Sequence, residues 1–218
     1  MSKKVRIGID VGGTFTDAVV IDNDTYEIIA KKKIPTTHDA VGGVATGIVN
    51  IINEILQDNN ISPLDVNFIA HGTTQATNAL LEGDVAKVGV LGMGTGIDSS
   101  TAKSGTHTED IELAQGKFLK VYNRFVDSKK LNEALIEQSI EELKSEGAEV
   151  IVASEAYSVD DPTNELKVIE KANQKEMFAT GGHEISQLYG LKVRTRTAVV
   201  NASLIPKMME TANMTEQA

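Results

Sequence analysis

The feature that most constrains the fold is the stretch "RIGIDVGGTFTDAVVID" at residues 6–22, where two apolar runs flank a short polar turn. So few residues separate the runs that the two strands they predict must be antiparallel. An aspartate stands on each side of the turn, Asp10 before it and Asp17 after it. A plain hairpin needs neither acid. The stretch therefore predicts a strand pair whose turn does more than reverse the chain.

The first 95 residues predict an α/β fold of the order β-β-β-α-β-α-β in one mixed sheet. Short connections make the first three strands an antiparallel meander, and the later strands are expected to be parallel. The predicted elements are strands at 5–10, 18–22 and 26–34, a helix capped by Asp39 with its apolar residues at Val41, Val44, Ile48, Ile51 and Ile55, a strand at 66–70, a helix at 73–83 that stops at Gly83, and a strand at 86–94.

The remainder of the chain divides into a segment at 96–180 and a connecting helix within 181–218. Weak periodicity and frequent Ser, Thr and Gly predict a loop-rich insertion at 96–125. An α/β segment follows, with a helix at 129–146, a strand at 149–156, a helix at 162–173 and a last helix at 195–212 that Pro206 breaks or kinks. Little sequence follows the apolar residues of that helix, so we expect the chain to be one lobe of a longer protein.

Composition excludes several classes of function. The formal net charge of −10 argues against a nucleic-acid-binding role, which needs a basic surface. Cysteine is absent, which excludes disulfides, thiol catalysis and cysteine-ligated metals. We find neither an apolar stretch of membrane-spanning length nor a secretory signal pattern, so we expect a cytoplasmic protein with no membrane partner. Homo-oligomer formation is left open.

The turn itself predicts a phosphate and magnesium site. Gly12 and Gly13 permit close approach of backbone N–H groups to an anion, and Thr14 and Thr16 add hydroxyl donors. A carboxylate beside such a turn holds Mg²⁺, normally through water, and Asp10 is the candidate. The alternative is an ordinary glycine-rich hairpin with an Asx-turn. The turn is neither a Walker loop nor a dinucleotide fingerprint, because no Gly-Lys-Ser/Thr follows it and the next element is a strand.

A second polar segment follows the strand at 66–70. His71 would bind substrate or phosphate, or transfer a proton near neutral pH. Thr73 and Thr74 begin a helix whose free N–H groups and dipole favour an anion. In the alternative interpretation, one threonine is only a helix cap and the histidine is structural. Asn78 is expected to brace the loop rather than touch a ligand.

Three stretches resemble one protein family. "GIDVGGTFTDAVV" resembles the first phosphate loop of the actin, sugar-kinase and heat-shock-chaperone ATPase superfamily, and its Gly-Gly-Thr-Phe-Thr-Asp form resembles the hydantoinase/oxoprolinase (hydantoinase A) family. "AHGTTQATNALLEG" and "RTRTAVVNASLIP" resemble two further segments of that family, in the same order. The chain departs from the family at 96–98, where Gly-Ile-Asp replaces a Gly-Phe-x-Asp motif and no Ile-Gly-Arg stretch follows, which puts the substrate in doubt.

The resemblance implies a ribonuclease H-like ATPase lobe that uses ATP and Mg²⁺. It implies ATP-dependent opening of a cyclic amide (hydantoin, N-methylhydantoin or 5-oxoproline) through a phosphorylated amide oxygen, with a second lobe or partner subunit completing the site. An acetone-carboxylase-like subunit or small-molecule kinase, and a non-catalytic lobe, are the alternatives. We expect this chain alone to be inactive. The candidate residues are Asp10 and His71 for catalysis, Gly12, Gly13, Thr14, Thr16, Thr73 and Thr74 for nucleotide binding, and Asp10 and Asp17 for the metal.

Overall fold

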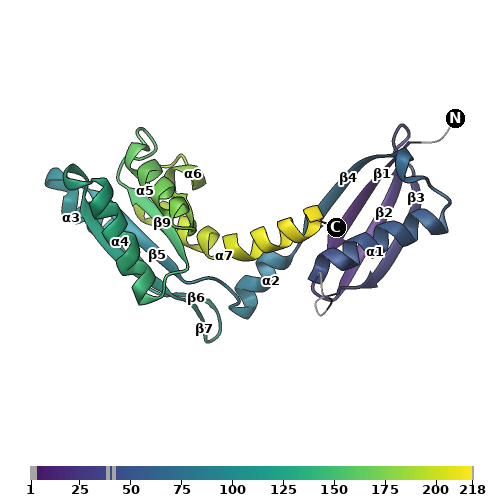
Figure 1. The fold of residues 1–218 in the computed structure, drawn as a ribbon, viewed down its shortest axis with the longest axis horizontal. Coiled ribbons are helices and arrows are strands. Elements are labelled where there is room, and N and C mark those ends of the chain that lie inside the picture. The colour runs from purple at the N-terminus through teal and green to yellow at the C-terminus, as the bar shows by residue number, and fades with distance from the viewer. Residues whose placement is uncertain (1–3, 38–39, 41–42, 218) are drawn as a thin grey trace. The chain divides into compact units, whose positions relative to one another are not determined.

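The computed structural model describes residues 4–37, 40 and 43–217, which divide into two compact units (Figure 1). The first unit comprises Met1–Asn78 and Lys207–Ala218, and the second comprises Ala79–Pro206. These boundaries differ from those expected at 95 and 180, because the second unit begins before the predicted strand at 86–94. Each unit is described by itself below.

The first unit is built on a four-stranded mixed sheet of order β3-β2-β1-β4. The first three strands form the expected antiparallel meander, and β4 pairs with β1 in parallel. Antiparallel neighbours need only short connections, whereas the parallel strand β4 is reached through a helix. The strands are β1 (Val5–Val11), β2 (Phe15–Asp22), β3 (Ile28–Pro35) and β4 (Val66–Thr73).

One face of this sheet packs against α1 (Gly43–Asp58). Alternate residues of β1 and β2 are buried there, with Ile48, Ile51 and Ile55 of the helix. The helix predicted from the spacing of these residues is thus present, while its expected cap, Asp39, lies outside the described residues. The opposite face of the sheet is lined by half-buried and exposed side chains. Short elements complete this region: η1 (Pro63–Asp65) and α2 (Gln75–Glu82), which spans the boundary between the units.

The second unit contains a parallel sheet of order β10-β9-β5-β8. Its first strand, β5, is the strand expected at 86–94, so that strand does not extend the sheet of the first unit. All seven residues of β5 are buried, which requires a layer of structure on each face. The strands are β5 (Val88–Gly94), β8 (Val121–Asp127), β9 (Val150–Glu155) and β10 (Phe178–Gly181).

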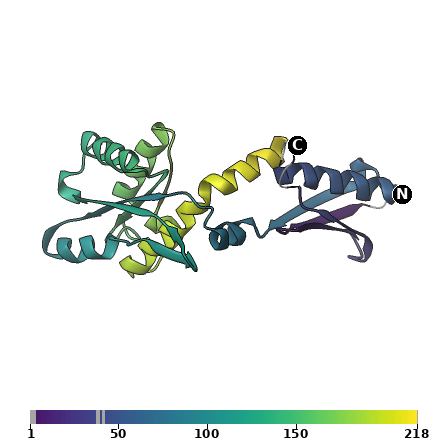
Figure 2. The same cartoon turned by 90° about the horizontal axis from the view of Figure 1, so that it is seen from below.

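Helices cover both faces of the second sheet (Figure 2). On one face lie α4 (Glu133–Glu146) and α5 (Thr163–Gln174), whose buried residues share a core with Leu91 and Met93. On the other lie α3 (Ser99–Thr106) and the first half of α7 (Leu191–Gln217). The expected α/β fold class is confirmed.

Residues 96–125, expected to be loop-rich, instead hold regular structure. A short helical turn and α3 come first, followed by a two-stranded hairpin and the start of β8. The elements not yet named are η2 (Gly96–Asp98), β6 (Ile111–Ala114), β7 (Lys117–Leu119), η3 (Ser128–Lys130) and α6 (Gly182–Ile185). Helix α7 continues through Pro206 rather than breaking there.

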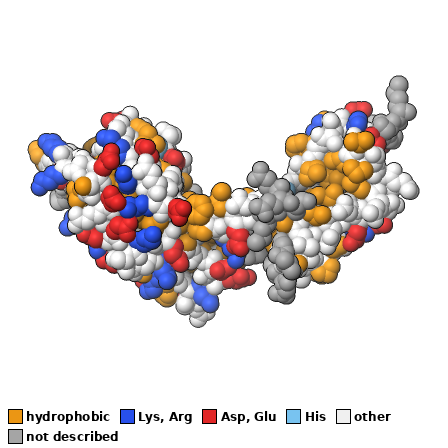
Figure 3. Space-filling model, in the orientation of Figure 1, with side chains coloured by type: hydrophobic (Ala, Val, Ile, Leu, Met, Phe, Trp, Pro, Cys, Tyr) orange, Lys and Arg blue, Asp and Glu red, His pale blue; other side chains and the backbone are white. Residues whose placement is uncertain are grey.

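The surface charges of the second unit are mixed. Acidic and basic side chains alternate over this part of the molecule in Figure 3, and several form ion pairs, such as Lys175 with Glu137 and Glu141 at 2.7 and 2.8 Å. Among the described residues, no helix is both long and apolar enough to cross a membrane.

Candidate functional site

The turn between β1 and β2 is closed by main-chain and threonine hydrogen bonds. The N–H of Gly12 donates to the carbonyl of Phe15 at 2.9 Å. Thr36 binds the turn twice: its hydroxyl donates to the Gly12 carbonyl at 2.8 Å and its N–H to the Thr14 carbonyl at 3.0 Å. The carbonyls are thus occupied by protein donors, and Gly13 and Thr14 are left at the surface.

The second polar segment meets the end of β1 at the same place. The Val11 carbonyl accepts from the Thr73 hydroxyl and from the Thr74 N–H, each at 3.2 Å. Thr73 also caps α2, because its hydroxyl accepts from the Gln75 N–H at 3.1 Å. The two motifs found in the sequence are therefore joined by hydrogen bonds in the first unit.

Gly13 packs closely against the side chain of Asn78. A Cβ added there would lie 2.9 Å from Nδ2 of Asn78, a contact that real Cβ atoms essentially never show. Asn78 is on α2, one turn after Thr74, whose carbonyl accepts the Asn78 N–H at 2.9 Å. The Asn78 side chain therefore packs against the turn, as the sequence interpretation expected.

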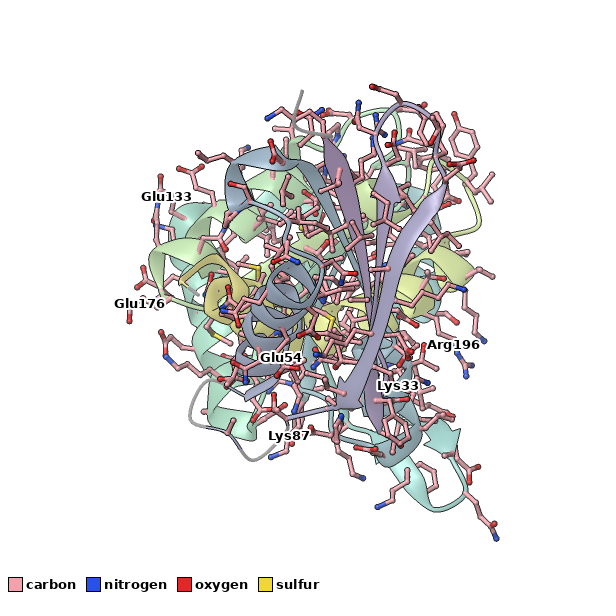
Figure 4. All side chains as sticks on the ribbon, turned by 90° about the vertical axis from the view of Figure 1, so that its right-hand side faces the viewer. Lys33, Glu54, Lys87, Glu133, Glu176 and Arg196 are labelled. Carbon is pink, nitrogen blue, oxygen red and sulfur yellow. The ribbon has the colours of Figure 1, made fainter. Side chains whose placement is uncertain are left out.

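Asp10 and Asp17 lie side by side on the sheet face that α1 leaves uncovered. They are direct partners in the β1–β2 register. Asp17 pairs with Lys33 of β3 at 3.2 Å, whereas Asp10 has no ion pair among the described residues. Figure 4 shows Lys33 on the opposite side of the sheet from Glu54 of α1. A hollow of about 740 Å³ lies at this face, and both aspartates line it.

Two candidate residues are not brought to this face. Thr16 is fully buried, and its hydroxyl is hydrogen-bonded to that of Thr36 at 3.2 Å, so it supports the turn from beneath. His71 pairs in register with Ile9, whose side chain is in the α1 core. Because side chains alternate along a strand, His71 belongs to the α1 side of β4, although it also borders the hollow.

The acids fit a cation held jointly with a ligand rather than by protein alone. Like charges directly opposite each other on two strands repel, and Lys33 offsets only one of them. The part of the chain that the structure describes has no cluster of three or more His, Asp or Glu side chains arranged for a metal. Mg²⁺ commonly binds through one or two carboxylates with water and phosphate oxygens, which matches this donor set.

Sequence reasoning missed two residues that shape the site. Lys33 lies in the strand predicted at 26–34, and its register with Asp17 depends on a pairing between strands that the sequence alone does not reveal. Thr36 follows Pro35 in a segment with no periodicity. Its signal was weak: a small hydroxyl residue soon after a strand end.

Arg194 belongs to the interior of the second unit. It is only 2% exposed. Its guanidinium donates to the carbonyls of Leu188 and Glu155 at 2.6 and 2.8 Å. Burial lowers its pKa from the usual range, and the nearby charge of Glu165 opposes that shift. The residue is therefore structural.

The chain matches the family described as hydantoinase/oxoprolinase N-terminal region over residues 6–176. The chain belongs to the hydantoinase/oxoprolinase family. That match covers the β1–β2 turn and the His-Gly-Thr-Thr segment, and it confirms the resemblance seen in the sequence motifs.

Curated relatives and solved structures agree with this family. The chain is 29% identical to caprolactamase subunit alpha of Pseudomonas jessenii, over 95% of this chain and 32% of that protein. It is 27% identical to an uncharacterized protein of Methanocaldococcus jannaschii, over 92% of this chain and 31% of that protein. The chain thus spans about a third of the length of these relatives.

Two solved structures share the fold. The ATP-dependent caprolactamase from Pseudomonas jessenii superposes with a TM-score of 0.61 at 28% identity, covering 94% of this chain and 32% of that one. A nucleotide-free acetone carboxylase gives a TM-score of 0.68 at 18% identity, covering 99% of this chain and 35% of that one. At 18% identity, the similarity to acetone carboxylase is evidence for a shared fold only.

Proposed function

We propose that this chain is the N-terminal part of an ATP-dependent hydrolase of cyclic amides. The observation that carries the proposal is the turn at Gly12–Thr14, which hydrogen bonds from Thr36, Thr73 and Thr74 hold beside Asp10. The carboxylate of Asp10 has no ion pair among the described residues. The similarity to caprolactamase subunit alpha supports a lactam as the substrate class. A hydantoin or 5-oxoproline is the closest chemical alternative, because each presents the same ring amide.

In this proposal the exposed turn binds phosphate. Gly13 and Thr14 are exposed at the surface, and none of the turn residues from Gly12 to Thr14 carries a negative charge. Thr73 and Thr74 hold the adjoining strand end against the turn. Thr16 and Thr36 keep the turn in shape from the buried side, so their contribution is to position the backbone donors.

Asp10 is the residue proposed to hold Mg²⁺ through water, with Asp17 beside it. Bound there, the metal would offset the negative charge of the nucleotide phosphates. Lys33 keeps Asp17 in place at 3.2 Å and limits the net charge of the site. We propose His71 as a substrate-facing or proton-transferring group of β4, on the side of the strand away from Asp10.

The proposed chemistry addresses the poor reactivity of an amide. An amide carbonyl is a weak electrophile, and transfer of the γ-phosphoryl group of ATP to its oxygen would activate the carbon toward attack by water. The ring C–N bond would then break to release the amine and leave an acyl phosphate, which a second water would hydrolyse to a carboxylate and phosphate. The superfamily's nucleotide sites lie between two lobes, so we propose that a second lobe or partner subunit completes this one. We also propose that the protein acts in the cytoplasm.

The test uses the complete enzyme that contains this chain, with its partner subunit. Release of phosphate from ATP is measured with caprolactam, hydantoin, N-methylhydantoin and 5-oxoproline, and separately with acetone plus bicarbonate. We expect one cyclic amide to stimulate phosphate release, and Asp10→Asn to abolish the stimulation. Glu27→Gln, which removes an exposed carboxylate in the same unit, is the matched control and should retain it.

Two results would overturn the proposal. Stimulation by acetone plus bicarbonate alone would assign a carboxylase. Full activity in Asp10→Asn would show that the carboxylate of Asp10 has no part in the reaction. For the isolated chain we expect weak Mg·ATP binding by calorimetry and no turnover; micromolar binding with turnover would contradict the need for a second lobe.

A further inference from the structure

A polar hollow lies in the second unit, whereas the proposed nucleotide site belongs to the first unit. It has a volume of about 560 Å³, within the range of small-ligand pockets. The residues around it come from α3, from the segment that follows α3, and from α7. All of them belong to the second unit, so the hollow is a property of that unit alone.

Helices α3 and α7, which both contribute residues to this hollow, pack closely against each other. A Cβ added to Gly105 of α3 would lie 2.8 Å from Cδ2 of Leu191 at the start of α7. A larger residue at position 105 would therefore require the side chain of Leu191 to shift. The approach brings Lys103 of α3 into the same hollow as Lys192 and Arg196 of α7.

These three cations form no direct ion pair among the residues that the structure describes, although the chain has 31 acidic residues against 21 basic ones. Lys192 and Arg196 are also four residues apart on one helix, where like charges repel. Figure 4 shows the Arg196 side chain extending outward from the ribbon. A bound anion would relieve this repulsion.

The acids at the hollow do not neutralise it. Asp110 is bound by Lys120 at 2.5 Å and by the N–H of Val121 at 3.0 Å, and the lysine holds the pKa of this carboxyl below its usual range. Its charge is therefore already compensated. Glu109 is exposed and offsets one of the three cations, which leaves an excess of positive charge.

The uncharged groups are mainly hydrogen-bond donors suited to oxyanions. Ser100 and Ser104 add hydroxyls one helical turn apart on α3, and His107 adds an imidazole. Arginine and lysine beside hydroxyl donors form the usual side-chain set for phosphate and carboxylate oxygens. We propose that this hollow binds a small organic molecule carrying two or more negative charges on phosphate or carboxylate oxygens. The proposal does not rest on the proposed hydrolase activity.

The test measures binding to the full chain at low ionic strength. Pyrophosphate and citrate serve as the probes, one for each kind of oxyanion, and calorimetry gives the dissociation constants. We expect at least one probe to bind, and Lys192→Gln and Arg196→Gln each to weaken that binding by about tenfold. Lys144→Gln is the matched control: it removes an exposed, unpaired lysine from α4, on the opposite face of the sheet, and should leave the constant within about twofold.

A second readout separates this site from the β1–β2 turn. Amide shifts in a nitrogen–proton correlation spectrum should move at Lys103, Gly105 and Lys192 on addition of the probe. Shifts confined to Gly12 and Gly13 would assign the binding to the turn and overturn the proposal. So would the absence of binding by both probes at millimolar concentration, or an equal loss in Lys144→Gln, which would mean that only overall charge matters.

Discussion

Replacing Glu165 with alanine should strongly destabilise the second unit. Glu165 is fully buried, and its carboxylate accepts hydrogen bonds from the N–H groups of Glu155 at 2.8 Å and His183 at 3.0 Å. Nδ1 of His183 donates to the same carboxylate at 2.5 Å, since a carboxylate can only accept. Arg194 is buried nearby, and the negative charge of Glu165 favours its charged form. One side chain thus satisfies three donors from two separate elements, β9 and α6.

The size of the effect follows from what the alanine leaves unpaired. Each buried N–H that loses its acceptor costs about 1–3 kcal/mol, and breaking a buried charge pair by removing one partner costs about 3–5 kcal/mol. These overlap, so we expect a loss of about 4 kcal/mol in the free energy of unfolding. Glu165→Gln keeps one acceptor oxygen and the side-chain volume, and its loss should be about 2 kcal/mol.

Hydrogen exchange is the suitable assay, because the chain has two units that need not unfold together. Exchange of the slowest amides of β9 and β5 reports the second unit, and exchange in β1 and β2 reports the first. Glu165→Ala should speed exchange in β9 and β5 and leave β1 and β2 nearly unchanged. Glu137→Gln, which breaks an exposed ion pair on α4, is the control and should change little.

One outcome would refute this reasoning. If Glu165→Ala lowered the unfolding free energy reported by β9 by less than about 1 kcal/mol, the buried donors would have found other partners. An equal loss in Glu165→Ala and Glu165→Gln would also count against it, since it would make the charge rather than the acceptors responsible.

Three further predictions follow from single contacts. Asp10→Asn should raise the unfolding free energy of the isolated chain by about 0.5 kcal/mol in urea titrations, because it relieves cross-strand repulsion, and a decrease would contradict that repulsion. Gly92→Ala should cost about 1–3 kcal/mol by thermal unfolding, because its Cβ would collide with the side chain of Thr106. Lys120 depresses the pKa of Asp110, so Asp110 stabilises the fold above the ordinary Asp pKa, and this stabilisation is lost as the pH falls through the depressed value. Acid titrations followed by circular dichroism should therefore show Asp110→Asn to be less stable than the original chain near neutral pH and equally stable in strong acid. A stability difference that does not depend on pH would exclude the charge as its cause.

Local pattern predicted the elements of the first unit well. The apolar runs on either side of the glycine turn fixed β1 and β2, and the spacing of Ile48, Ile51 and Ile55 fixed α1. Both signals depend on residues close in sequence, where strand and helix periods are visible. The roles of Asp10 and its neighbours in ligand binding stay predictions.

Pairing between distant segments was the part that local pattern could not supply. The apolar run of β5 has the same appearance in either sheet, and only its partners β8 and β9, far along the chain, decide where it lies. The burial of Thr16 could have been predicted, because Thr16 points to the same face of β2 as the apolar residues Ala18 and Val20. The burial of Arg194 could not be predicted from local sequence, because the carbonyl groups that accept its hydrogen bonds come from two other segments.

The two ends of the second unit lie close together. The N–H of Ala86, just before β5, donates to the carbonyl of Ser203 in α7 at 2.9 Å, although 117 positions (203 − 86) separate them. A segment whose ends meet in this way is an exchangeable module. It could be cut out and replaced by a short linker, or grafted into a loop of an unrelated host, without stretching the flanking chain. Within one family, such a module can diverge while the strands that precede it keep their sequence.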